Sequence, residues 1–142
     1  MRLPALTFAV LLSFASVGHA FEAINRLQVV PLGAQGFEVI EARGDGARGM
    51  WCAAADYAIT RQNIRCDQRL YVKSPRGPSV SGAGRIGVVF TTDVNALSVA
   101  PSQSYSVSVR VAGQGLPLHH AYQFCKGYIL EIDDIFYRLE KN

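Results

Sequence analysis

The run from Met50 to Thr60 constrains the fold more than any other part of the chain. It contains the single tryptophan of the sequence, one of its three cysteines and its densest group of strong helix formers. Cys52, Ala55 and Ile59 recur at helical spacing, so they share one face of the expected helix. The small alanine side chains allow such a helix to lie close against a sheet. We therefore expect the fold to be built around this helix.

Strands are expected before and after this helix. The segments have strand composition or alternate apolar with polar residues, and stretches rich in glycine and proline separate them. The clearest is the last, in which apolar side chains alternate with serines and one arginine. That pattern is typical of an antiparallel strand with one solvent-exposed face. Strands are expected over residues 27–30, 37–42, 69–73, 86–91 and 104–111, with loops over 43–49 and 74–84.

Helical spacing returns after the last expected strand. Pro117 suits the first position of a helix, and the apolar residues from Leu118 to Cys125 form one face of it. Gly127 weakens or ends this helix. The apolar residues from Tyr128 to Leu139 then keep helical spacing opposite acidic residues. This tail is expected to be a second amphipathic helix or a kinked continuation of the first.

The order of strands, helix, strands and helix predicts the α+β class. We expect a mostly antiparallel sheet of about five strands, with the central helix and the C-terminal helical segment packed on one face. A purely parallel, doubly wound sheet is disfavoured, because it would bury the serine face of residues 104–111.

The first 20 residues have the pattern of a secretory signal peptide. A basic start, a short apolar core and Gly18-His19-Ala20 precede the expected cleavage after Ala20. An uncleaved membrane anchor is disfavoured, because a span needs about 20 apolar residues. The expected mature chain, residues 21–142, has 122 of the 142 residues and forms a single α+β domain without a membrane span. We expect the protein to be exported, to the periplasm or the medium.

The charge of the chain argues against a nucleic-acid partner. The whole chain has a net charge of +3, and removal of residues 1–20 takes away one arginine and no acidic residue, leaving +2. Nucleic-acid-binding domains are more basic and cluster their basic residues on one face. Here the basic residues are scattered along the sequence.

The three cysteines all lie in the expected mature chain, where an oxidising compartment favours a disulfide. Cys52 and Cys125 both lie on apolar helix faces that must pack on the same core, so their pairing is favoured. Cys52 with Cys66 is the alternative, because loop entropy separates the two bonds by only about 1 kcal/mol. Cys66 lies in a polar connection and is expected to be free, or joined to another chain.

No arrangement of residues predicts a catalytic, cofactor or metal site. Residues 77–82 have serine where a nucleophile elbow requires glycine. His119 and His120 are neighbours, which a helix turns about 100° apart, so they do not aim at one ion. Asp56 is expected to be an exposed helix residue. Arg43-Gly44-Asp45 is the tripeptide of integrin ligands, and such a tripeptide arises easily by chance in a glycine-rich turn.

Several segments together resemble a group of small uncharacterised bacterial exported proteins. The resemblance covers most of the expected mature chain. It implies export, and it implies the pairing of Cys52 with Cys125, because the cysteines after tryptophan and after phenylalanine recur in that pattern whereas Cys66 is an addition. It implies no activity. The segments are Trp51-Cys52-Ala53-Ala54-Ala55-Asp56-Tyr57-Ala58, Arg69-Leu70-Tyr71-Val72, Ser74-Pro75-Arg76-Gly77, Gly87-Val88-Val89-Phe90-Thr91 and Phe124-Cys125.

Three functions are left open by these patterns. The favoured one is a non-catalytic binding or structural module that acts outside the cytoplasm. The second is a small hydrolase or thiol-dependent enzyme that uses Cys66, His119 or His120. The third is a toxin-like or inhibitor protein, which the size and the expected disulfide permit but no motif supports.

The signal peptide yields the first prediction. Protein recovered from the periplasm or the medium should begin at Phe21, because the cleavage pattern ends at Ala20. Intact-mass spectrometry of the recovered protein measures this directly. A mass that still includes residues 1–20 would contradict it.

Overall fold

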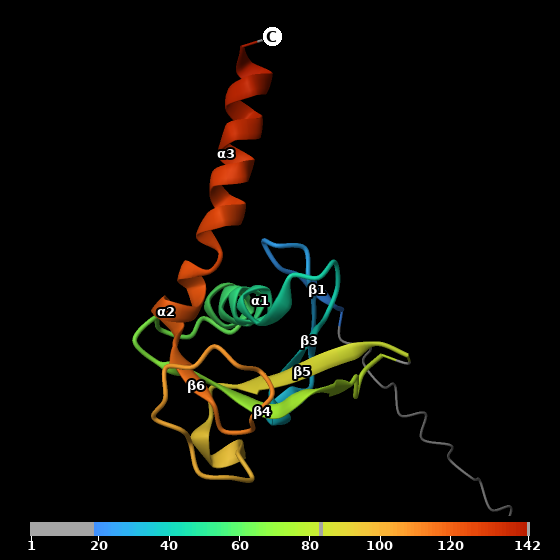
Figure 1. Cartoon of the computed structure of the whole chain (residues 1–142), viewed down its shortest axis with the longest axis vertical. Helices are drawn as coiled ribbons and strands as arrows, with labels where there is room; N and C mark the ends of the chain where they lie inside the picture. Colours follow the sequence, from blue (N-terminus) through green and yellow to red (C-terminus); the bar gives the residue numbers. More distant parts are fainter. Residues whose placement is uncertain (1–18, 83, 142) are drawn as a thin grey trace, which may run out of the picture.

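The computed structural model describes residues 19–82 and 84–141 (Figure 1). The expected signal peptide, residues 1–20, lies outside the described residues apart from His19 and Ala20. The described part is an α+β fold with a buried central helix on an antiparallel sheet. The fold class expected from the sequence is therefore confirmed.

In this part of the chain, six strands form one antiparallel sheet in the order β1-β2-β3-β5-β4-β6. None of the helices in residues 19–82 and 84–141 has both the length and the apolarity needed to cross a membrane. The elements are β1 (Phe21–Glu22), β2 (Gln28–Pro31), η1 (Gly33–Gln35), β3 (Phe37–Ile40), α1 (Gly46–Thr60), β4 (Arg69–Pro78), β5 (Ile86–Thr91), η2 (Val94–Ala96), β6 (Gly115–Pro117), α2 (Leu118–Gln123) and α3 (Lys126–Glu140).

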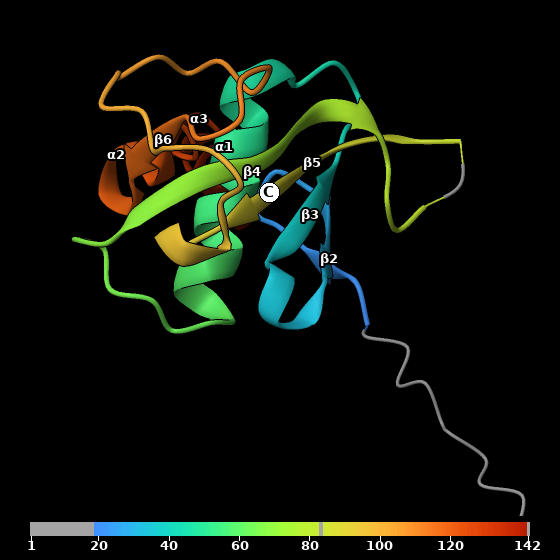
Figure 2. The ribbon, with the colours of Figure 1, turned by 90° about the horizontal axis from the view of Figure 1, so that it is seen from below.

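Helix α1 is the centre of the molecule. It lies over one face of the sheet, with α2 beside it (Figures 1 and 2). All residues from Gly49 to Ala58 are buried, so this part of the helix is enclosed on every side. The Trp51 ring packs edge-on against Phe90 at 5.0 Å between centroids, and its Nε1 donates a hydrogen bond of 2.9 Å to the Val107 carbonyl. The central helix predicted from the sequence is therefore confirmed.

Residues 104–111 do not form a strand, so that prediction was wrong. Three serine hydroxyls along the segment each accept a hydrogen bond from the backbone N–H two residues later. The hydroxyls belong to Ser104, Ser106 and Ser108, the N–H groups to Ser106, Ser108 and Arg110, and the distances are 3.1–3.2 Å. These local bonds occupy N–H groups that would otherwise donate hydrogen bonds to the carbonyls of a neighbouring strand. Of the four apolar residues that the alternation predicted to face inward, Val109 is buried and Val107 is partly buried, but Tyr105 and Val111 are 66 and 56 % exposed. The alternation therefore indicated the inward face only for the middle of the segment.

Three other boundaries differ from the expected ones. Helix α1 begins at Gly46, so half of the expected loop over 43–49 is helical. Strand β4 continues through residues 74–78, which were expected to be a loop, and two shifts in its register against β5 accommodate Pro75. The sixth and first strands, β6 and β1, are short edge strands that the sequence did not predict.

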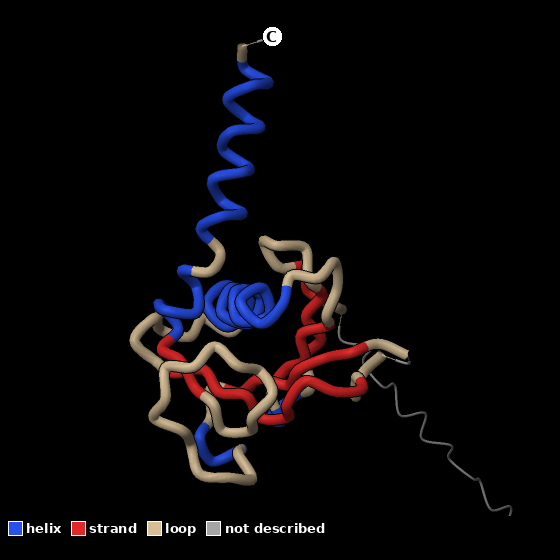
Figure 3. Tube along the Cα trace, in the orientation of Figure 1, coloured by secondary structure: helices blue, strands red, loops and turns tan. Residues whose placement is uncertain are grey.

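The C-terminal helical segment divides into a packed part and a projecting part. Leu118 and Ala121 of α2 are buried. Helix α3 rises away from the body of the molecule and none of its residues is buried (Figures 1 and 3). The tail is amphipathic and kinked as expected, with the break at Phe124 and Cys125 instead of at Gly127. The expectation that the whole segment packs on the sheet holds only for α2.

The disulfide joins Cys52 in α1 to Cys125, which is the N-cap residue of α3. Both cysteines are fully buried, and their Cα atoms lie 5.1 Å apart. Cys66 is free and exposed. The pairing favoured by the apolar helix faces is therefore the one that forms.

Glu38 is a carboxylate buried within strand β3, all four residues of which are buried. It accepts hydrogen bonds from the Ser79 hydroxyl at 2.9 Å, from the backbone N–H groups of Val80 and Ser81 at 2.9 and 3.0 Å, and from the Ser81 hydroxyl. A Cβ atom at Gly87 would overlap the carboxylate. The serines that resemble part of a nucleophile elbow thus hold the β4–β5 connection in place.

Loss of the disulfide should destabilise the fold strongly. The Cys52→Ser/Cys125→Ser variant should lose about 4 kcal/mol of unfolding free energy, because the bond spans 73 positions of the chain. Urea unfolding followed by Trp51 fluorescence measures the change. The matched control, Cys66→Ser, should stay within about 0.5 kcal/mol of the parent, because its side chain is exposed. An equal loss in the control would contradict this assignment.

Candidate functional site

The structure places His119 against the backbone of Cys66 and places His120 among aromatic rings. The backbone N–H of His119 donates to the Cys66 carbonyl at 3.1 Å, and the His119 Nδ1 atom lies 3.2 Å from the same oxygen. The imidazole of His119 therefore contacts the backbone of Cys66. The ring of His120 stacks on Tyr105 with centroids 6.1 Å apart, and it lies tilted against Phe124 with centroids 5.7 Å apart. The two histidines thus have separate neighbours.

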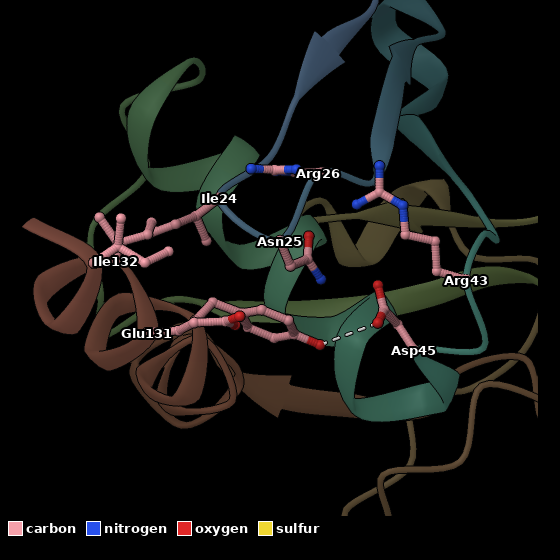
Figure 4. Close-up of a pocket in the computed structure, with 9 residues that line it drawn as sticks. Ile24, Asn25, Arg26, Arg43, Asp45, Glu131 and Ile132 are labelled. Carbon is pink, nitrogen blue, oxygen red and sulfur yellow. Dashed lines mark hydrogen bonds between the residues drawn. The ribbon is translucent and has the colours of Figure 1, made fainter. Parts of the chain in front are cut away.

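A cleft of about 290 Å³ lies where α3 leaves the body of the molecule. Three segments form it: the β1–β2 loop, the β3–α1 loop and the first half of α3. Figure 4 shows Glu131 and Ile132 of α3 together with the loop residues Arg26, Arg43 and Asp45 around this space. The cleft is lined by Ile24, Asn25, Arg26, Arg43, Asp45, Tyr128, Glu131, Ile132 and Ile135.

Two buried polar residues hold the β1–β2 loop against α1. The Asn25 side chain donates a hydrogen bond of 2.8 Å to the Gly49 carbonyl. The backbone N–H of Ile24 donates to the Asp56 carboxylate, also at 2.8 Å. Asp56 is therefore buried, and the expectation of an exposed aspartate was wrong. A buried carboxylate is tolerated here because it satisfies an N–H group of a loop distant in the sequence.

The two arginines of the cleft stand on strained backbone. Arg26 has a φ of 63° and Arg43 a φ of 57°, in the left-handed region that side chains other than glycine rarely adopt. Such conformations cost on the order of 1–3 kcal/mol each and persist where the surroundings impose them. Both side chains are exposed. Two guanidinium groups are thus presented to solvent from fixed loops on one side of the cleft.

Asp45 and Tyr128 join the start of α1 to the first turn of α3. The Tyr128 hydroxyl donates to Oδ1 of Asp45 at 3.3 Å (Figure 4), and Oδ2 of Asp45 is buried without a hydrogen-bond partner among the described residues. Burial, and then the Asp45 carboxylate, raise the pKa of Tyr128 above its usual value of 10.0. The hydroxyl therefore stays protonated as a donor. Asp45 of the integrin-like tripeptide is turned toward the cleft instead of projecting from it.

Beyond the cleft, α3 exposes a continuous apolar side. We call the set Ile132, Ile135, Phe136 and Leu139 the α3 surface; these side chains are 38, 50, 66 and 67 % exposed. Helical spacing places the four on one side of α3. Ile132 and Ile135 also line the cleft, so the cleft and the α3 surface are continuous.

The described residues that line the cleft include no cysteine, serine, threonine or histidine. Two arginines, two carboxylates and a phenol surround an apolar strip that leads out along α3. Among the described residues, no three His, Cys, Asp or Glu side chains come together in a way that could hold a metal ion. Sequence reasoning missed Asn25 and Arg26 entirely. The apolar side of the tail helix is the part of the site that the sequence pattern could have indicated.

Asp56 should make the stability depend on pH. Burial raises its pKa above the usual 3.8, and the hydrogen bond from Ile24 opposes this less strongly. The native state then binds more protons than the unfolded state from pH 3.8 up to the raised pKa, so stability falls as pH rises through that interval and levels off above it. Asp56→Asn keeps an oxygen acceptor and should remove this fall.

Urea unfolding of the parent and of Asp56→Asn across this pH range tests the assignment, because the other groups titrate in both proteins. Asp67→Asn is the matched control, since that carboxylate is exposed. A stability difference between parent and Asp56→Asn that does not change with pH would refute it.

Comparison of the chain with protein-family models, with curated proteins and with solved structures found no match.

Proposed function

We propose that this chain is an exported, non-catalytic protein-binding module whose binding surface is the cleft together with the α3 surface. The observation that carries the proposal is the row of apolar side chains, 38 to 67 % exposed, along one side of a helix that projects from the body. Contiguous exposed apolar surface of this kind marks interaction sites in proteins. Cys66, His119 and His120 have no catalytic role in this proposal.

The stability of α3 itself supports a partner. Most of the stability of a helix in a protein comes from packing of its amphipathic face, and isolated helices shorter than about 12–15 residues are marginal in water. Helix α3 has 15 residues, and none of them is buried. The residues of α3 that line the cleft are Tyr128, Glu131, Ile132 and Ile135, and those of α3 beyond position 135 are exposed. A partner that covers the α3 surface would supply the packing that the outer turns lack.

The shape of the surface favours an elongated macromolecule over a small ligand. The cleft, at about 290 Å³, is at the lower end of the range for small-molecule pockets. The α3 surface continues past it to Leu139 on a helix about 22 Å long. A helix or an extended segment of another protein can cover both parts at once. Arg26 and Arg43 then orient that segment, as arginines commonly do at protein interfaces.

Export rests on two supports. The first is the signal-peptide pattern of residues 1–20. The second is the buried Cys52–Cys125 disulfide, which persists in the periplasm or the medium and is rare in the cytosol. In such a compartment the exposed Cys66 offers a second, covalent connection to a partner.

Site-specific photo-crosslinking in the producing cells tests the binding surface. A benzophenone amino acid replaces Ile135 in one strain and Leu130 in the other. Leu130 is equally apolar and 68 % exposed, but its helical position places it on the opposite side of α3. Irradiation should give covalent protein adducts at position 135 and about tenfold fewer at position 130, because only the α3 surface meets the partner.

Equal yields at the two positions, or no adduct at either, would refute the proposal. Crosslinking should be carried out in a Cys66→Ser background, so that a disulfide cannot supply the adduct. The mass of each adduct shows whether the partner is another protein or a second copy of the chain.

A further inference from the structure

The apolar side of α3 carries a heptad repeat. Beginning at the N-cap residue Cys125, apolar side chains recur at steps of three and four residues: Cys125, Tyr128, Ile132, Ile135 and Leu139. This spacing is that of the a and d positions of a coiled coil, which form a straight seam on the helix. Cys125 is already buried in the disulfide, and Tyr128 is partly buried with its hydroxyl bonded to Asp45. The exposed part of the seam is therefore Ile132, Ile135 and Leu139, with the Tyr128 ring at its inner end.

The seam has the same spacing when it is followed in either direction. The steps from Tyr128 to Leu139 are four, three and four residues. Two copies of α3 placed antiparallel therefore pack Tyr128 of each copy on Leu139 of the other, and Ile132 on Ile135. Resting on the proposed function, we infer that the partner of the α3 surface is a second copy of this chain, bound through an antiparallel pair of α3 helices.

The residues that flank the seam favour this orientation. Glu131 and Arg138 occupy equivalent flanking positions, and in an antiparallel pair Glu131 of each copy faces Arg138 of the other. A parallel pair would place Glu131 beside Phe136. Arg138 also bridges Asp134 of its own helix at 2.9 Å, and both groups are exposed. Such exposed pairs add little affinity, but they select between orientations.

The cleft is complementary to the end of the second helix. In the antiparallel pair, the C-terminal turn of one α3 reaches the level of Tyr128 in the other, beside the cleft. The C-terminal end of a helix carries a partial negative charge, and the exposed guanidinium groups of Arg26 and Arg43 stand at the cleft. Two carboxylates also line the cleft. Asp45 accepts a hydrogen bond from Tyr128, and Glu131 lies beside the seam.

Sedimentation equilibrium tests the self-association. The chain of residues 21–142 with Cys66→Ser is compared with the same chain carrying Ile135→Asp or the matched change Leu130→Asp. The parent and Leu130→Asp should sediment at twice the mass of the chain. Ile135→Asp should raise the dissociation constant at least about tenfold, because a charge enters the seam. Near-ultraviolet circular dichroism of buried Trp51 checks that all three are folded.

Disulfide trapping tests the orientation. In the Cys66→Ser background, Ile132→Cys and Ile135→Cys are made in separate chains of different isotopic mass. Mild oxidation of the mixture should form a disulfide between residue 132 of one chain and residue 135 of the other. Each variant alone should form at least about tenfold less disulfide-linked dimer, because the antiparallel seam does not place position 132 beside position 132, or 135 beside 135.

A monomer at every concentration would overturn self-association. Photo-crosslinked adducts with a different protein would then still support the proposed binding function. The absence of any adduct would refute the proposed function as well. A dimer that Ile135→Asp does not weaken would also overturn the inference, because it uses another surface. Efficient linkage of Ile132→Cys alone would show a parallel pair and refute the antiparallel one.

Discussion

The Cys52–Cys125 disulfide joins the helix that carries the core to the residue at which α3 begins. Every residue of α1 from Gly49 to Ala58 is already buried against the sheet, α2 and the loops. A helix anchored at Cys125 therefore finds no free apolar surface of α1 on which to pack. The apolar side of α3 therefore extends past the body of the molecule. The cause is that the surface of α1 is already covered by other parts of the chain.

Buried polar side chains fix several loops of the molecule, including the β1–β2 loop at the cleft. Asn25 and Asp56 fix the β1–β2 loop to α1, and Glu38 holds the β4–β5 connection through four hydrogen bonds. Asp56 and Glu38 accept hydrogen bonds from donors that lie far away in the sequence, and Asn25 donates one to the distant Gly49 carbonyl. Buried polar groups of this kind specify one arrangement of a loop. Arg26 is held beside the base of α3 as a result.

The parts of the fold that depend on apolar periodicity were predictable from the sequence. The central helix, strand β5 and the disulfide all follow from which faces must be buried. Residues 104–111 were not, because serine hydroxyls compete for the backbone N–H groups of a segment whose apolar pattern is that of a strand. The burial of Asp56 depends on a loop 32 positions away. The amphipathic tail was predicted, but its pattern does not distinguish burial within one chain from burial between chains.

The concentration dependence of hydrogen exchange in α3 tests the central claim most directly. Amides of residues 128–139 should exchange slowly in concentrated solution and at least about tenfold faster on dilution, because the outer turns depend on a second helix, whereas amides of α1 should not respond. Fast exchange of α3 at every concentration, or protection that dilution does not change, would contradict a helix stabilised by a second copy of the chain.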